Sequence, residues 1–289
     1  MNYTNLHCDT ASKMYEKKQA LSKNSLHIDM EKASAYDRYS QVFAIWSDND
    51  KSDDDNYDDF FRILKNLEIE FIFNEMKLCR TKGEYKNAPK HRAILGAEGG
   101  KLLGSDISRL DKLYESGVRI LTLVWGGICE IGGAFDNGEG LTGFGREVVK
   151  RAEELGIIID LSHSNTKIID EVLSLTKKPL IASHSNSRSV FDHPRNLTDD
   201  HFKAIRDRGG VVGISLCRTH VAETPDIAAV LRHIEHYLEL GGEHTITFGC
   251  DFDGCTLPDG FQNIGDILKL GQSEDIMYRN ADAFFEKNL

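Results

Sequence analysis

The chain has 289 residues and a net charge of −11, and 40% of its residues are hydrophobic while 28% are charged. This balance is typical of a soluble globular protein, and the negative charge argues against nucleic-acid binding, which needs basic patches. The length suffices for one barrel of about 250 residues or for two ordinary domains. Because prolines are few and no Ser/Gly-rich linker occurs, we expect a single domain over residues 1–289.

Eight short apolar runs recur along the chain, and each has the length of a buried parallel strand. They cover residues 3–8, 41–46, 93–97, 119–124, 157–161, 180–183, 211–216 and 245–249. Amphipathic segments typical of helices lie between them, at 58–78, 144–155, 168–175, 199–208 and 227–240. Strict alternation of strand and helix predicts a parallel sheet, and eight repeats predict its closure into a (β/α)8 TIM barrel.

One acidic segment, residues 47–59, follows the second predicted strand. Its spacing of acids loosely resembles a calcium-binding loop, but the glycine expected at the sixth position of such a loop is Asp53 here. We therefore expect a solvated acidic loop rather than a calcium site.

Residues of the kinds that bind metal ions stand at the ends of four of the apolar runs. These residues are His7, Asp9, Glu98, His163 and His184. In a (β/α)8 barrel the carboxyl ends of the strands form one rim, and the active site lies there. Convergence of imidazoles and carboxylates on that rim predicts the site of a metal-dependent hydrolase.

The spacing of two of these groups adds detail. His7 and Asp9 are two residues apart on a strand, so both side chains can point to the same face. Glu98 stands in the sequence GAEGG, where flanking glycines leave space around the carboxylate. A carboxylate can bridge two cations, whereas an imidazole cannot. Taken singly, each histidine would more commonly be a buried core residue.

Two further charged residues are candidates for the chemistry. Asp251 and Asp253 follow the last predicted strand in GCDFDG, and a carboxylate beside a bound water is a natural proton acceptor. We favour Asp251, because the turn at Gly254 should carry Asp253 away. Arg195, on the loop after the sixth predicted strand, offers a planar fork suited to a substrate carboxylate, and the alternative is a surface salt bridge.

The cysteines and the ends of the chain bear on localisation. The six cysteines lack CxxC spacing, which favours reduced thiols of a cytoplasmic protein. The first metal-type residue occurs at position 7, so we expect no signal peptide, and no apolar stretch is long enough to span a bilayer. We therefore expect a cytoplasmic protein that binds neither membranes nor nucleic acids.

Several motifs together resemble the membrane dipeptidase (renal dipeptidase) family of zinc peptidases. They are LHCDT at 6–10, GAEGG at 96–100, RILTLVW at 119–125, LTGFGREVVKRAEELGIIIDLSHSN at 141–165, PLIASHSNSRSVFDHPRNLTDD at 179–200, GGVVGI at 209–214 and TFGCDFDG at 247–254. The resemblance implies a barrel with two zinc ions. One zinc would be held by His7 and Asp9 and the other by His163 and His184, with Glu98 bridging them.

The resemblance also implies roles for residues that bind no metal. Arg195 would bind the substrate's carboxylate, and Asp251 would act in proton transfer near the bridging water. In mammalian members a histidine that contacts the substrate stands where this chain has Trp125. This departure resembles soluble bacterial branches of the family and bears on substrate range. The alternative is that Trp125 only fills the rim of the barrel.

These observations lead to one principal hypothesis and two alternatives. The principal hypothesis is a binuclear zinc dipeptidase whose substrates are small peptides with a free carboxylate, and family resemblance suggests a homodimer. One alternative is a metal-dependent hydrolase of another amide or of a phosphoester, since the same ligands permit it. The other is a metal-binding module with weakened catalysis. The retention of every expected ligand argues against this alternative.

Overall fold

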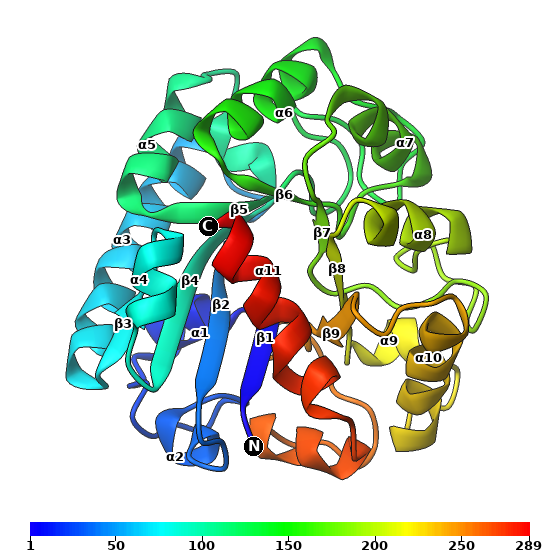
Figure 1. Ribbon diagram of the computed structural model, residues 1–289. Helices are drawn as coiled ribbons and strands as arrows, with labels where there is room; N and C mark the ends of the chain where they lie inside the picture. The colour runs from blue at the N-terminus through cyan, green and yellow to red at the C-terminus, as the bar shows by residue number, and fades with distance from the viewer.

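The computed structural model describes residues 1–289, and its nine strands form one parallel sheet (Figure 1). Eight of the strands follow one another around a closed barrel, because β1 pairs with both β2 and β9, and β2 pairs with β4. The predicted (β/α)8 barrel is therefore confirmed. The strands are β1 (Tyr3–Cys8), β2 (Tyr39–Trp46), β3 (Met76–Leu78), β4 (His91–Glu98), β5 (Val118–Thr122), β6 (Ile158–Asp160), β7 (Ile181–Ala182), β8 (Val211–Ile214) and β9 (Ile246–Phe248).

Helices surround the barrel (Figure 1), and several begin at side chains that cap them. Thr142, Asn165, Thr198 and Asp226 each accept a hydrogen bond from a backbone amide in the first helical turn. None of the helices has the length and apolar character needed to cross a membrane. The α-helices are α1 (Thr10–Lys17), α2 (Met30–Ala33), α3 (Asp53–Phe73), α4 (Lys82–Asn87), α5 (Ser108–Ser116), α6 (Gly143–Leu155), α7 (Thr166–Leu175), α8 (Asp199–Asp207), α9 (Arg218–Val221), α10 (Ile227–Glu239) and α11 (Asn280–Asn288).

The sequence-based assignment was wrong around the third helix, at both of its ends. The acidic segment is not all loop, because the Ser52 side chain caps α3, which begins at Asp53. Three aspartates then occupy the first turn, where the positive end of the helix dipole stabilises them. The helix ends at Phe73 rather than Leu78, and the left-handed backbone of Glu75 leads into β3.

Strand β3 was missed, and it lies outside the barrel. It pairs with the first three residues of β4, below the level at which β5 begins to pair with that strand. Met76 and Leu78 are buried and the residue between them is exposed, which is the period-2 pattern of a strand. Three residues of this pattern are too few to distinguish a strand from the end of the preceding amphipathic helix.

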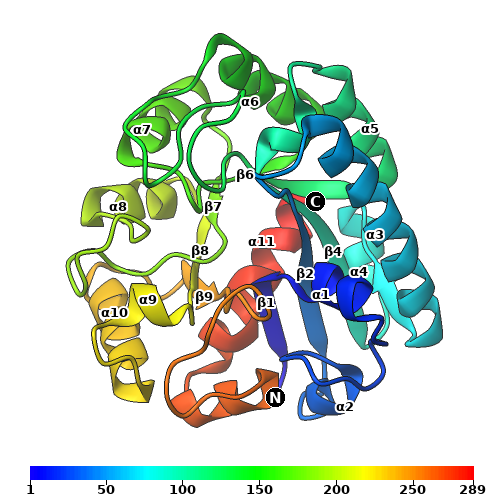
Figure 2. The ribbon, with the colours of Figure 1, turned by 180° about the vertical axis from the view of Figure 1, so that it is seen from behind.

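The end of the barrel opposite the strands' carboxyl ends is closed by α11. This helix lies in front of the barrel in Figure 1 and behind the strands in the reversed view of Figure 2. Phe284 and Phe285 pack against apolar side chains from inside the barrel, including Leu6, Ile94 and Ile158. Apolar side chains therefore fill the interior of the barrel at this end.

Candidate active site

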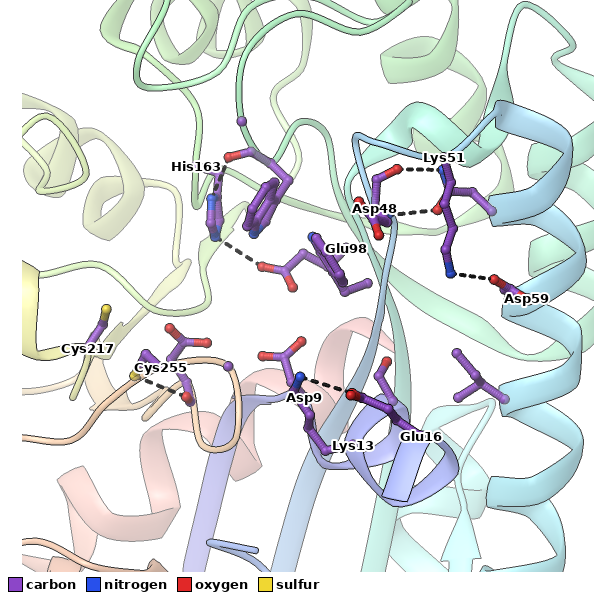
Figure 3. Close-up of a pocket in the computed structure, with 18 of the residues that line it drawn as sticks. Asp9, Lys13, Glu16, Asp48, Lys51, Asp59, Glu98, His163, Cys217 and Cys255 are labelled. Atoms are coloured by element: carbon purple, nitrogen blue, oxygen red, sulfur yellow. Dashed lines mark hydrogen bonds and ion pairs between the residues drawn. The ribbon is translucent and has the colours of Figure 1, made fainter. Parts of the chain in front are cut away.

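The five predicted metal ligands lie together at the carboxyl-end rim, beside a pocket of about 920 Å³. His7 lies near the end of β1, Glu98 ends β4, and His163 and His184 follow β6 and β7. All of their side chains are buried, as is that of Asp9. Figure 3 shows Asp9, Glu98 and His163 directed into the pocket.

Glu98 stands at the centre of the group. One of its oxygens, Oε2, lies 3.4 Å from His7 Nε2, while Oε1 lies 3.0 Å from His163 Nε2 and 3.6 Å from His184 Nε2. His7 Nε2 is also 3.5 Å from Asp9 Oδ2, and the Nε2 atoms of His163 and His184 are 2.9 Å apart. The carboxylate therefore connects a His–Asp pair with a His–His pair.

The outer nitrogens of two histidines are held by hydrogen bonds. His163 Nδ1 lies 2.7 Å from the backbone oxygen of Trp125, and His184 Nδ1 lies 2.7 Å from Ser183 Oγ. The Ser183 hydroxyl in turn donates to Asp160, which is fully buried. A proton on each Nδ1 leaves Nε2 as a lone-pair donor facing the pocket, the arrangement that metal-binding histidines adopt.

The charge of the cluster suits a cation. Burial raises the pKa of Asp9, and repulsion by Glu98 raises it further. Burial opposes ionisation of Glu98, but the neighbouring imidazoles of His7 and His163 hold its pKa below the usual range. His7 Nε2 is buried and has no hydrogen-bond partner. Crowded carboxylates and an unpartnered imidazole nitrogen are the donor set that divalent transition metals take.

Asp251 lies at the edge of this cluster, in the loop after β9. Its Oδ1 is 3.8 Å from His7 Nε2, and its backbone adopts the left-handed conformation, with φ of 58°. A Cβ on Gly254 would lie 2.1 Å from Asp9 Oδ2 and 2.5 Å from Asp251 Oδ1, so only glycine permits this close approach. Burial and the neighbouring Asp9 raise the pKa of Asp251 well above its usual value.

Asp253, the other acid of this loop, turns away from the pocket. Its carboxylate accepts hydrogen bonds from the backbone amide of His27, at 2.7 Å, and from the Thr10 hydroxyl. It therefore ties this loop to the start of α1 and to the segment between α1 and α2, and it does not face the metal-type cluster.

Arg195 lies beside the pocket as a buried cation without a partner. Only 4% of the residue is exposed, and its Nε and Nη2 atoms have no hydrogen-bond partner. The guanidinium carbon lies 5.6 Å from the centre of the Phe135 ring. A buried guanidinium with two free N–H groups is a strong site for an anion that accepts both.

Trp125 lies at the pocket mouth and is 36% exposed. Its ring contacts Trp46 edge-on, with ring centres 4.9 Å apart, and lies 6.0 Å from the His163 ring. The residue therefore has two connections to the site: its ring narrows the mouth and its backbone oxygen holds His163.

The structure adds residues that the sequence did not indicate. Cys217, His220 and Cys255 line the pocket next to Asp251. The neighbouring Cys255 thiol, and after it His220, lower the pKa of Cys217 to about 3 against the effect of burial. The two cysteines are far apart in the chain and lack metal-motif spacing, so only the pairing of β8 with β9 brings their loops together.

Comparison with known proteins gives consistent matches. The sequence model of the membrane dipeptidase family, peptidase family M19, matches residues 1–280. An uncharacterised protein in the pqqA 5′ region of Klebsiella pneumoniae is 32% identical over 72% of this chain and 82% of its own length. Dipeptidase 3 of Mus musculus is 30% identical over 73% of this chain, and the match covers 44% of the mouse protein.

Solved structures agree with the family match. The metallopeptidase dipeptidase AC superposes with a TM-score of 0.92 at 25% identity, over 100% of this chain and 98% of that one. A metallopeptidase from Rhodobacter sphaeroides, solved with a phosphinate mimic of the dipeptide L-Ala-D-Ala, superposes with a TM-score of 0.91 at 24% identity, over 100% and 99% of the two chains. With the family model covering nearly the whole chain, this protein belongs to the membrane dipeptidase family (peptidase family M19) and is a metallo-dipeptidase.

Proposed function

We propose that this metallo-dipeptidase uses two zinc ions to hydrolyse dipeptides that carry a free C-terminal carboxylate. The observation that carries the proposal is the pairing of a cluster of metal-type donors with the unpartnered guanidinium of Arg195 on one pocket. His7 and Asp9 would hold one ion, His163 and His184 the other, and Glu98 would bridge both. The chemistry that two such ions supply is a water of lowered pKa and a polarised scissile carbonyl.

The chain's own residues would carry the remaining steps. Arg195 would hold the substrate's carboxylate with its two free N–H groups, which fixes the scissile bond relative to the cluster. Asp251 would accept a proton from the attacking water and return it to the leaving amine, a role that its position at the edge of the cluster, 3.8 Å from His7 Nε2, supports. Trp125 would limit the size of side chain that enters the mouth, and its indole N–H could donate to the developing oxyanion.

A turnover assay with zinc or cobalt against a panel of dipeptides, other amides and phosphoesters tests this function. Selective turnover of dipeptides supports it. Turnover confined to another substrate class contradicts the dipeptide assignment, and metal binding without any turnover contradicts an active enzyme. A cytoplasmic, single-domain homodimer remains our prediction, which cell fractionation and light scattering can check.

The role of Arg195 gives a prediction about substrate charge. Arg195→Lys keeps the charge but loses the bidentate fork, so it should raise KM for free dipeptides. C-terminally amidated dipeptides should be poor substrates of the wild type. Arg195→Ala should bring the kcat/KM values of free and amidated substrates closer together. The measurement is kcat/KM for matched pairs of substrates. Equal wild-type rates on both members of each pair would contradict this role.

Trp125 gives a prediction about substrate range. Trp125→His introduces a smaller ring and should widen acceptance of bulky side chains. A lost oxyanion donor typically lowers rates about 10²–10³-fold, so a gain of about tenfold on one substrate would already show that the residue shapes the site. Trp46→Phe is the comparison, since it alters the ring that supports Trp125. If Trp125→His and Trp125→Ala both leave kcat/KM within about twofold on every substrate, Trp125 only packs the rim.

A further inference from the structure

A second group of metal-type donors lies on the pocket wall, separate from the five residues assigned above. One donor atom from each of Cys217, Asp251 and Cys255 lies within 4.8 Å of the other two. In Figure 3 Cys217 and Cys255 stand together on the side of the pocket away from Asp48, Lys51 and Asp59. The proposed dipeptidase chemistry uses neither thiol.

We propose that Cys217, Cys255 and Asp251 form a binding site for a thiophilic divalent cation, such as Zn²⁺ in excess or Cd²⁺, whose occupation inhibits the enzyme. Thiolates are the preferred ligands of such ions, and a carboxylate completes many of their sites. Zinc–sulfur bonds of about 2.3 Å place tetrahedral donors roughly 3.5–4 Å apart. The three donors therefore need to move by only about an ångström to share an ion.

The local structure holds the two thiols in place. Cys217 precedes α9, and its sulfur lies 3.4 Å from Thr219 Oγ1 and 3.9 Å from His220 Nε2. Cys255 Sγ donates to the backbone oxygen of Asp251, at 3.3 Å. Both cysteines are partly exposed and line the pocket, so an ion can reach them from solvent.

Inhibition follows from the shared carboxylate. A cation bound to the two thiols would engage Asp251, which then could not exchange protons with water or with the leaving amine. This consequence rests on the proposed role of Asp251 in the dipeptidase, whereas binding of the ion does not. The two parts of the inference therefore need separate measurements.

The test is a titration of the reduced enzyme, carrying its catalytic metals, with Cd²⁺. Cd²⁺ bound to thiolate gives an ultraviolet charge-transfer band that Cd²⁺ bound to histidine and carboxylate does not. We expect the band to saturate at one equivalent in the wild type. Cys217→Ser and Cys255→Ser should each remove about half of it or more and weaken binding at least about tenfold. Asp251→Asn should weaken binding while it keeps both thiols.

The matched control is Cys129→Ser, which removes a partly buried thiol that belongs to no cluster of metal-type residues. This variant should keep the full band. Absence of the band in the wild type, or its survival in both Cys217→Ser and Cys255→Ser, would overturn the site.

The second readout is dipeptidase activity, expressed for each variant relative to its own rate without Cd²⁺. One equivalent of Cd²⁺ should inhibit the wild type and the Cys129→Ser variant, and the inhibition should be lost in the two cluster variants. A wild-type band without inhibition would overturn the inhibitory role. An enzyme without dipeptidase activity would contradict the proposed function, and the charge-transfer band would still decide the site.

Discussion

Replacement of His184 by alanine is expected to remove about one of two metal equivalents and nearly all dipeptidase activity, and His163→Ala should do the same. The reason is geometric, since the two Nε2 atoms face each other across 2.9 Å and both lie close to Glu98 Oε1. Five donor groups are too many for one tetrahedral ion with an open position. The measurement is elemental analysis of protein purified without chelator, together with the rate on a dipeptide.

The comparison variant is His236→Ala, which removes an imidazole that bonds a carboxylate, that of Asp199, outside the pocket. It should keep both metal equivalents and most of the activity. Full metal content in both His163→Ala and His184→Ala would refute the ligand assignment. Circular dichroism of each variant separates loss of metal from loss of fold.

Asp251→Asn is expected to keep the metals and to slow turnover by at least about 100-fold, the usual scale of general acid–base catalysis. An amide is nearly the same size as the carboxylate but cannot accept the proton at neutral pH. Asp251 lies 3.8 Å from His7 Nε2 without being needed to complete the five-donor set. Metal content and kcat measured on the same preparation test both halves of this expectation.

Asp253→Asn provides a matched comparison within the same loop. Its carboxylate bonds to the His27 amide and the Thr10 hydroxyl, so its loss should lower stability more than kcat. If Asp251→Asn loses metal, Asp251 is a ligand and its proposed role in proton transfer is wrong. A similar loss of kcat in both variants would point to loop geometry rather than to proton transfer.

The architecture of the barrel followed from local patterns in the sequence. All eight barrel strands coincide with predicted apolar runs, and α6, α7, α8 and α10 begin within two residues of the predicted starts. Apolar runs, helical periodicity and N-cap side chains act over a few residues, so the sequence displays them directly. The membership of the family was also evident from motifs at the strand ends, and the family match confirmed it.

The sequence could not predict structural features that depend on very short segments or on contacts between distant residues. Strand β3 has only three residues. It forms because the first residues of β4, which do not pair with β5, pair with it instead. The acidic segment contains the cap and first turn of α3, since acids there favour the dipole of a helix whose apolar stripe begins later. In both places tertiary pairing or a helix end outweighed the composition of the segment.

The sequence by itself determined the barrel, the family and the residue types at the rim. The sequence favoured Asp251 over Asp253, but only the tertiary structure decided the geometry that separates them, because both lie in left-handed backbone that no periodic pattern predicts. The same holds for the meeting of Cys217 with Cys255, which come from loops after paired strands. Strand periodicity is local, whereas the distances between side chains on different strands are set by closure of the whole barrel.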